Sequence, residues 1–141
     1  MDNAGDWEFS NSGNTIIQND GIILFRATAS LIGGHTGAHV ITNTGRFYNQ
    51  GFIHYRDLGP SLLSNTNYFN NSGTLQGGLF GGGGLINQDS LINSGIIELD
   101  TIGLNGLTNT GFFLNDTSGK YYADYIGQNG VFNDTSGIVK N

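Results

Sequence analysis

The sequence contains no cysteine, one proline and only five lysine and arginine residues among its 141 positions. The absence of cysteine excludes a disulfide scaffold and thiolate metal sites. Because contacts to phosphates need clustered cations, five scattered cations and a net charge of −6 argue against nucleic-acid binding. No apolar run approaches 18 residues, so we expect no membrane-spanning helix. The start, MDNAGDWEF, lacks the charged and apolar regions of a signal peptide, which indicates a cytosolic protein or part of a longer chain.

A repeat of 22 residues organises most of the sequence. The segment 85–106, LINQDSLINSGIIELDTIGLNG, matches the segments 22 and 44 residues earlier in residue type at eight positions. The consensus is Φ-x-N-x-G-x-Φ-x-N-x-G-x-Φ, where Φ is apolar, followed by nine residues with another apolar position and a glycine. After a lead-in or partial cap at residues 1–8, the units that fill residues 9–141 begin at Phe9, Ile41, Leu63, Leu85, Leu107 and Val131. An insertion of about eight residues within 27–40 separates the first two units.

Alternation of residue type at every second position predicts strands rather than helices. Three sides, separated by two Asn/Gly corners and a longer glycine-containing turn, predict an all-β fold: a single-stranded parallel β-helix solenoid with about 22 residues per coil and about five to six coils. A left-handed hexapeptide helix is typical of coils of about 18 residues, and the LxxLxLxxN spacing of a leucine-rich repeat is absent.

Two asparagine columns recur through the units. One contains Asn11, Asn43, Asn65, Asn87, Asn109 and Asn133, and the other contains Asn19, Asn49, Asn71, Asn93, Asn115 and Asn141. Stacked at the strand spacing of about 4.8 Å, identical amides can hydrogen-bond along the solenoid as ladders, which satisfies groups that would be costly to bury unpaired. The position two residues after the first column holds Gly, Asn or Asp, the residues that best tolerate a left-handed backbone, so we expect left-handed bends there.

Apolar columns are expected to form the core between the corners. The first contains Ile17, Phe47, Phe69, Leu91 and Phe113; the second contains Ile23, Ile53, Leu75, Ile97 and Tyr121; the third contains Leu58, Phe80, Ile102 and Ile126. Each coil alone buries little apolar surface, and stacking makes the core continuous.

The tandem Φ-x-N-x-G-x-Φ-x-N-x-G units resemble the β-helical repeats of filamentous-haemagglutinin-type bacterial adhesins and related large exoproteins. The resemblance covers residues 9–141, although the NPNG-type secretion motifs of such exoproteins are absent. It implies a right-handed β-helix, an internal segment of a shaft, and a secreted or cell-surface bacterial protein that mediates adhesion.

Candidate ligand-binding residues are His35, Thr36 and His39, because long insertions on a repeat scaffold often carry binding. A metal site would need a third ligand and a fixed backbone, so no metal site is assigned. Six aromatic residues are candidate stacking platforms for sugar rings: Trp7, Tyr48, Tyr55, Tyr68, Tyr122 and Tyr125. Two outward apolar columns, Ile22/Phe52/Ile96 and Ile92/Leu114, indicate a covered face or a lateral contact.

The leading functional hypothesis is a non-enzymatic structural and adhesive module that binds glycan, protein or another cell-surface ligand through a loop or a lateral face. It assigns no catalytic residue and no cofactor, and it includes end-to-end or lateral self-association, because a β-helix cut across its axis exposes strand edges. One alternative is a carbohydrate-active β-helix, such as a polysaccharide lyase, hydrolase or tailspike-like fragment, which would need acids clustered in neighbouring coils. Another is an ice-binding β-helix, which would need an unbroken Thr-x-Thr rank.

Overall fold

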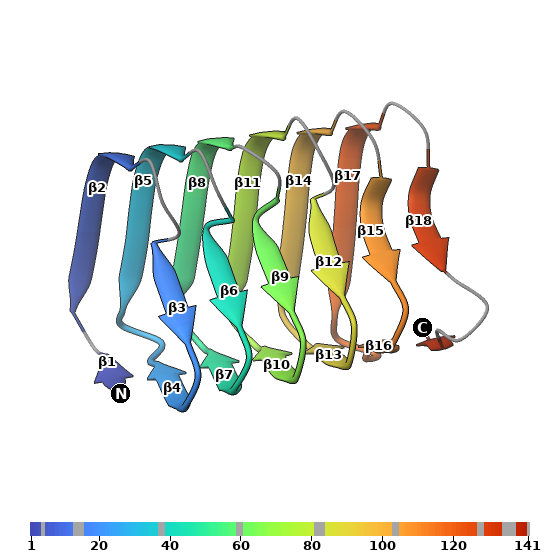
Figure 1. Ribbon diagram of the computed structural model, residues 1–141, viewed down its shortest axis with the longest axis horizontal. Coiled ribbons are helices and arrows are strands. Elements are labelled where there is room, and N and C mark those ends of the chain that lie inside the picture. The colour runs from blue at the N-terminus through green and yellow to red at the C-terminus, as the bar shows by residue number, and fades with distance from the viewer. Residues whose placement is uncertain are drawn as a thin grey trace.

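The computed structural model describes residues 1–3, 5–12, 16–36, 39–58, 61–80, 84–102, 105–126, 129–133 and 138–140. All of the strands in these ranges pair in parallel and stack into three sheets, as Figure 1 shows. Sheet A contains, in spatial order, β1 (Asp2–Asn3), β4 (Ile22–Phe25), β7 (Arg46–Asn49), β10 (Tyr68–Asn71), β13 (Ser90–Asn93), β16 (Phe112–Asn115) and β19 (Ile138–Lys140). Sheet B contains β2 (Asp6–Ser12), β5 (Ser30–Thr36), β8 (Phe52–Leu58), β11 (Thr74–Phe80), β14 (Ile96–Ile102) and β17 (Lys120–Ile126). Sheet C contains β3 (Ile17–Asn19), β6 (Ile41–Asn43), β9 (Leu63–Asn65), β12 (Leu85–Asn87), β15 (Asn105–Asn109) and β18 (Asn129–Asn133).

Each coil passes through sheets B, C and A in turn, which makes the fold the predicted parallel β-helix. In Figure 1 the chain rises through sheet B at the back, descends through sheet C at the front and advances from left to right, so the helix is right-handed. The step from Ile41 to Leu63, and each later step to Leu107, is 22 residues. Between Ile17 and Leu107 the register repeats four times, so about four turns are complete there, slightly fewer than the five to six coils we predicted.

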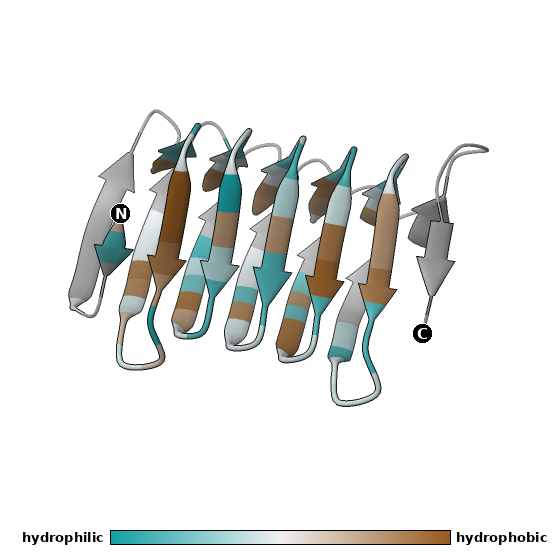
Figure 2. Cartoon of the chain, turned by 90° about the horizontal axis from the view of Figure 1, so that it is seen from below, coloured by the Kyte–Doolittle hydropathy of each residue, from teal (hydrophilic) through white to brown (hydrophobic). Residues whose placement is uncertain are grey.

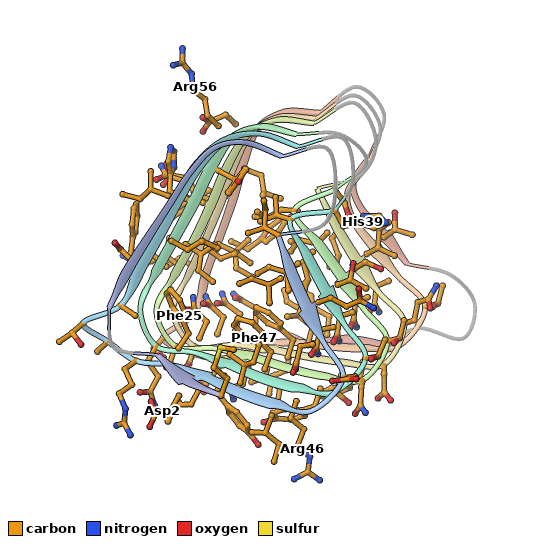
Figure 3. All side chains as sticks on the ribbon, turned by 60° about the vertical axis from the view of Figure 1, so that its left-hand side comes forward. Asp2, Phe25, His39, Arg46, Phe47 and Arg56 are labelled. Carbon is orange, nitrogen blue, oxygen red and sulfur yellow. The ribbon has the colours of Figure 1, made fainter. Side chains whose placement is uncertain are left out.

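The core is a stack of apolar side chains inside a triangular cross-section, seen nearly along the axis in Figure 3. Every sheet contributes inward columns, and the rings of Phe47 and Phe69 stack in one of them with centroids 5.0 Å apart. The buried columns are Ile17, Ile41, Leu63, Leu85 and Leu107 in sheet C; Ile23, Phe47, Phe69, Leu91 and Phe113 in sheet A; and Leu31, Ile53, Leu75 and Ile97 in sheet B. Because each side chain has a neighbour of similar size above and below, burial is continuous along the axis.

Two asparagine ladders run through the corners of the triangle. In the first, Nδ2 of each residue donates to Oδ1 of the residue one coil later, and every such bond from Asn19 through Asn43, Asn65 and Asn87 to Asn109 is 2.7 Å long. The second ladder joins Asn49, Asn71, Asn93 and Asn115 in the same way, also at 2.7 Å. The predicted ladders are therefore present over these residues, whereas the side chains of Asn133 and Asn141 lie outside the described residues.

The first coil has a different register from the predicted one. Ile17 pairs with Ile41 and Asn19 with Asn43, so the unit begins at Ile17 and not at Phe9. Asn19 consequently belongs to the first ladder, and Asn11 lies in β2, paired with His35. Phe25 stands at the position of Asn49, so a phenylalanine ends the second ladder. With this shift Ile23 joins the column of Phe47, and Leu31, which we had not placed in a column, joins that of Ile53.

The predicted eight-residue insertion within 27–40 is wrong, because it followed from the incorrect register that we assigned to the first unit. Residues 30–36 form β5, a regular strand paired with β8. The extra length is two residues, because 26–29 join β4 to β5 where Gln50 and Gly51 join β7 to β8. A turn closes this connection through a 2.8 Å bond from the Ala29 amide to the Arg26 carbonyl, and the connection from β16 to β17 has the same turn, from Gly119 to Asp116. Both connections appear as longer loops at the lower edge of Figure 2.

Corner glycines reflect the limited space between coils and not a left-handed backbone. No described residue has a positive φ, so the predicted left-handed bends are wrong. The Arg46 amide donates to the Gly21 carbonyl of the preceding coil at 2.7 Å. A Cβ atom on Gly45 would overlap that carbonyl oxygen, and one on Gly73 or Gly95 would meet an equivalent oxygen. Close stacking of backbone on backbone therefore favours glycine at these positions.

The segment expected to be a lead-in, residues 1–8, contains β1 and the start of β2. Strand β1 pairs with β4, and the Asp2 carboxylate accepts two 2.6 Å hydrogen bonds from the Arg26 guanidinium. Those bonds hold the pKa of Asp2 below its usual range. The contact lies at the surface, where an ion pair contributes little stability.

Candidate functional site

The three residues predicted to bind ligand do not lie on an insertion loop. His35 and Thr36 belong to β5, where they pair with Asp57 and Leu58 of β8. Their backbone is thus part of sheet B. The argument that placed a binding site there depended on a long loop, and it no longer applies.

His39 makes a contact between coils. Its ring is half-buried, and Nδ1 lies 2.5 Å from the hydroxyl of Ser61, one coil later. Ser61 is buried and its hydroxyl also donates to the Leu63 carbonyl at 3.3 Å, so Nδ1 of His39 is the donor to Ser61. Burial lowers the pKa of His39, which keeps the imidazole neutral at pH 7. Figure 3 places His39 beside sheet C.

The candidate stacking aromatics divide between the core and two outer faces. Tyr55 is fully buried, so it is not a platform. Tyr48 and Tyr68 are half-buried on the outer face of sheet A, and Tyr122 is exposed on that of sheet B. The side chains of Trp7 and Tyr125 lie outside the described residues.

The Tyr48 and Tyr68 rings form a pair on two adjacent coils of sheet A. Their centroids are 5.5 Å apart and their planes are inclined at 50°. Asn70 donates from Nδ2 to the Tyr68 hydroxyl at 3.3 Å, and Arg46, which pairs with Tyr68 across the strands, is exposed beside the rings. We call Arg46, Tyr48, Tyr68 and Asn70 the tyrosine platform. It combines two ring faces with amide, hydroxyl and guanidinium groups, which is the mixture that a polar ligand with apolar faces requires.

The outer face of sheet B contains a row of hydrogen-bonded polar side chains across three coils. His54 Nδ1 lies 3.1 Å from Gln76 Oε1, and Gln76 Nε2 donates to Glu98 Oε2 at 3.1 Å. Because the Glu98 carboxylate can only accept, Gln76 must direct its carbonyl oxygen toward His54, which makes Nδ1 the protonated nitrogen. The ring of Phe52 stacks on His54 with centroids 5.9 Å apart and planes 6° from parallel.

The predicted outward columns are partly confirmed. Ile92 pairs with Leu114 on sheet A, and Phe52 and Ile96 share a column with Thr74 between them on sheet B. Ile22 was assigned to the second of these columns, but it pairs with Arg46 on sheet A. Figure 2 shows that β4, which carries Ile22, is the most uniformly hydrophobic strand of sheet A.

A buried site that the sequence did not reveal lies on the inner side of sheet B. The Tyr55 ring occupies the space left by Gly33, one coil earlier, where any Cβ atom would overlap the ring. Within the described part of the chain, the Tyr55 hydroxyl is the buried side-chain polar atom without a hydrogen-bond partner. Burial raises the pKa of this tyrosine, so the hydroxyl remains protonated. An alternation of Gly33, Tyr55, Gly77 and Leu99 could have indicated the packing, had the register been known.

Comparisons with protein families, curated proteins and solved structures give no match to this chain. Among the described residues, no group of three or more His, Cys, Asp and Glu side chains is placed to hold a metal ion. The described part of the chain also has no helix that is long and apolar enough to cross a membrane.

Proposed function

We propose that the chain is a structural and adhesive repeat module of a bacterial exoprotein, secreted or held at the cell surface. The fold supports a role as a shaft, because each coil is bonded to the next through three sheets and two buried asparagine ladders. Such stacking gives a rigid rod whose inward residues are repeated while its outward residues vary. The family resemblance of the repeats supports the extracellular location.

Adhesion is assigned to the tyrosine platform on sheet A, and the observation that carries this assignment is the adjacent placement of Tyr48 and Tyr68. Aromatic rings on neighbouring coils can stack against the C–H faces of successive sugar units. Tyr48 and Tyr68 are diagonal neighbours on strands about 4.8 Å apart, so a glycan that crosses these two coils diagonally would meet both rings. Arg46 and Asn70 flank the rings and can hydrogen-bond to hydroxyl or carboxylate groups. The proposed ligand is therefore a linear glycan.

A glycan array tests this function with the purified chain and a Tyr68→Ala variant. We expect retention of one class of glycan by the wild-type chain and loss of at least about 90% of that signal in the variant, because a central aromatic contact carries a large share of binding. Tyr122→Ala is the matched control, since it removes an exposed tyrosine from sheet B and should leave retention unchanged. Circular dichroism would check that both variants fold.

Two results would contradict the proposal. Equal binding by the Tyr68→Ala variant would remove the platform from recognition, and no binding by the wild-type chain would leave a shaft without adhesive activity. Progressive loss of the array glycans would favour the alternative of a carbohydrate-active β-helix.

A further inference from the structure

The outer face of sheet B is self-complementary about its strand β11. We define the B face as the outward residues of β5, β8, β11, β14 and β17. One column contains Ser30, Phe52, Thr74, Ile96 and Lys120, and the next contains Ile32, His54, Gln76, Glu98 and Tyr122. A third column contains Arg56, Gly78 and Asp100, which directly follow the paired residues Tyr55, Gly77 and Leu99. In each column the residues one strand on either side of β11 have matching or opposite chemistry.

The charged residues show the complementarity most clearly. Arg56 lies one strand before Gly78, and Asp100 lies one strand after it, and both side chains are exposed. Neither forms a salt bridge with another described residue. In the adjacent column, His54 and Glu98 occupy the equivalent positions on either side of Gln76. A cation or hydrogen-bond donor on one side of β11 thus corresponds to a carboxylate on the other.

Apolar residues follow the same symmetry. Phe52 and Ile96 lie one strand on either side of Thr74. Ile32 and Tyr122 lie two strands on either side of Gln76, and they are 43% and 47% exposed.

A twofold rotation about an axis parallel to β11 and just above the B face brings a second copy face to face with the first. This operation keeps the strand direction and reverses the solenoid axis, so each column meets the same column of the partner. Arg56 then faces the partner's Asp100, His54 faces the partner's Glu98, and Gln76 meets its own equivalent. Phe52 faces the partner's Ile96, and Ile32 faces the partner's Tyr122. Such reciprocal contacts are the mark of an isologous interface.

We propose that the chain forms a face-to-face homodimer through the B face, with the two solenoids antiparallel. Gly78 has no side chain, because a Cβ atom there would overlap the Arg56 carbonyl of the preceding coil, and the charged pairs therefore lie on either side of a position without a side chain. Five strands spaced about 4.8 Å apart, each of about seven residues rising about 3.3 Å, give a face of roughly 550 Å² per copy. The total of roughly 1,100 Å² lies just below the range of stable specific interfaces, so the dimer is a weak and reversible one. Sheet A, with the tyrosine platform, stays exposed in this dimer.

Sedimentation equilibrium of the full chain tests the dimer and its symmetry. The wild-type chain should change from monomer to dimer as its concentration rises from micromolar to millimolar. Arg56→Glu places carboxylates opposite Asp100 at two symmetry-related points, so it should raise the dissociation constant at least about tenfold, and Asp100→Arg should do the same with cations. Arg46→Glu on sheet A is the matched control and should leave the dissociation constant unchanged.

The proposed twofold symmetry leads to two further expected results. A mixture of the Arg56→Glu chain and the Asp100→Arg chain should form a heterodimer, because both contacts then join opposite charges, and the double variant that exchanges the two charges should again form a homodimer. A wild-type chain that remains monomeric throughout the concentration range would overturn the proposal. A dimer that tolerates the single charge reversals, or one that is not restored by mixing, would overturn it equally, since its contact would lie elsewhere.

Discussion

The first asparagine ladder and the inner column of Gly33, Tyr55, Gly77 and Leu99 are two solutions to the same problem of stacking one coil on another. In the ladder every position is asparagine, and each amide bonds to the next at 2.7 Å. In the inner column of sheet B a large ring fits over a glycine, and no residue type is repeated in adjacent coils. Identity in the first and alternation of size in the second both fill the interior.

The contrast follows from what each column has to satisfy. Asn65 accepts bonds from the Asn43 side chain and the Asn67 amide, and its two amide hydrogens are shared among Asn87 Oδ1 and the carbonyls of Asn67 and Ser90. A different residue would therefore leave the ladder amides of the coils before and after it without their partner in the ladder. The column of Tyr55 carries mostly apolar groups, which need volume but no specific partner. Polar stacking therefore fixes residue identity, whereas apolar stacking fixes only the sum of neighbouring volumes.

The largest expected effect is that of replacing a ladder residue. Asn65→Leu keeps the approximate volume but removes five hydrogen bonds. It leaves the Asn87 amide oxygen without its donor and the Asn43 amide without its side-chain acceptor in the next coil. We expect a loss of about 3 kcal/mol or more in the free energy of unfolding, measured by urea denaturation followed by circular dichroism. Asn70→Leu is the matched control on the outer face, where the amide makes one bond of 3.3 Å, and it should cost less than about 1 kcal/mol. Equal losses of unfolding free energy in the two variants would mean that the hydrogen bonds of the ladder contribute no stability.

The columns with a fixed residue type are also those that the sequence predicts well. The ladders from Asn43 to Asn109 and from Asn49 to Asn115, and the column from Phe47 to Phe113, follow directly from the repeat because position and chemistry recur together. In the first coil Phe25 replaces the second asparagine. Because the first coil lacks this asparagine, the repeat pattern favoured aligning Asn19 with Asn49. That alignment turned two extra residues in a turn into an apparent eight-residue loop.

The candidate site was harder to predict, for a related physical reason. Outward residues are free of the stacking requirement, so residue type varies along their columns and does not show which side chains meet. The predicted site at His35, Thr36 and His39 followed from the register error. In contrast, Tyr48 and Tyr68 were identified as aromatics, but their pairing depends on the sheet face and needed the structure. Tyr55 is a tyrosine like Tyr48 and Tyr68, but it is buried, because its ring fills the space above Gly33, which has no side chain.

Gly33→Ala should disturb the size-matched column by a smaller amount. Its new methyl group would overlap the Tyr55 ring, which is fixed in a close-packed interior, and we expect a loss of about 2 kcal/mol in the free energy of unfolding. Gly21→Ala is the matched control, since a Cβ atom there would have nothing within 4 Å. Adding Tyr55→Leu to Gly33→Ala should restore part of the loss, because a smaller side chain makes room. If the changes in unfolding free energy of Gly33→Ala and Tyr55→Leu were strictly additive, the two side chains would not compete for the same space.

Tyr55→Phe should have the smallest effect and the opposite sign. The ring, which fills the space over Gly33, is kept, and the buried hydroxyl without a hydrogen-bond partner is removed. Since a buried unpaired polar group is destabilising, we expect a gain of about 1 kcal/mol in the free energy of unfolding, measured by the same urea titration. Tyr48→Phe, on the outer face of sheet A, should change stability by less than about 0.5 kcal/mol. A loss of stability in Tyr55→Phe would place a hydrogen-bonding partner, such as an enclosed water, beside the hydroxyl. The inner column of sheet B would then resemble the ladder in needing polar pairing, and volume alone would no longer explain its sequence.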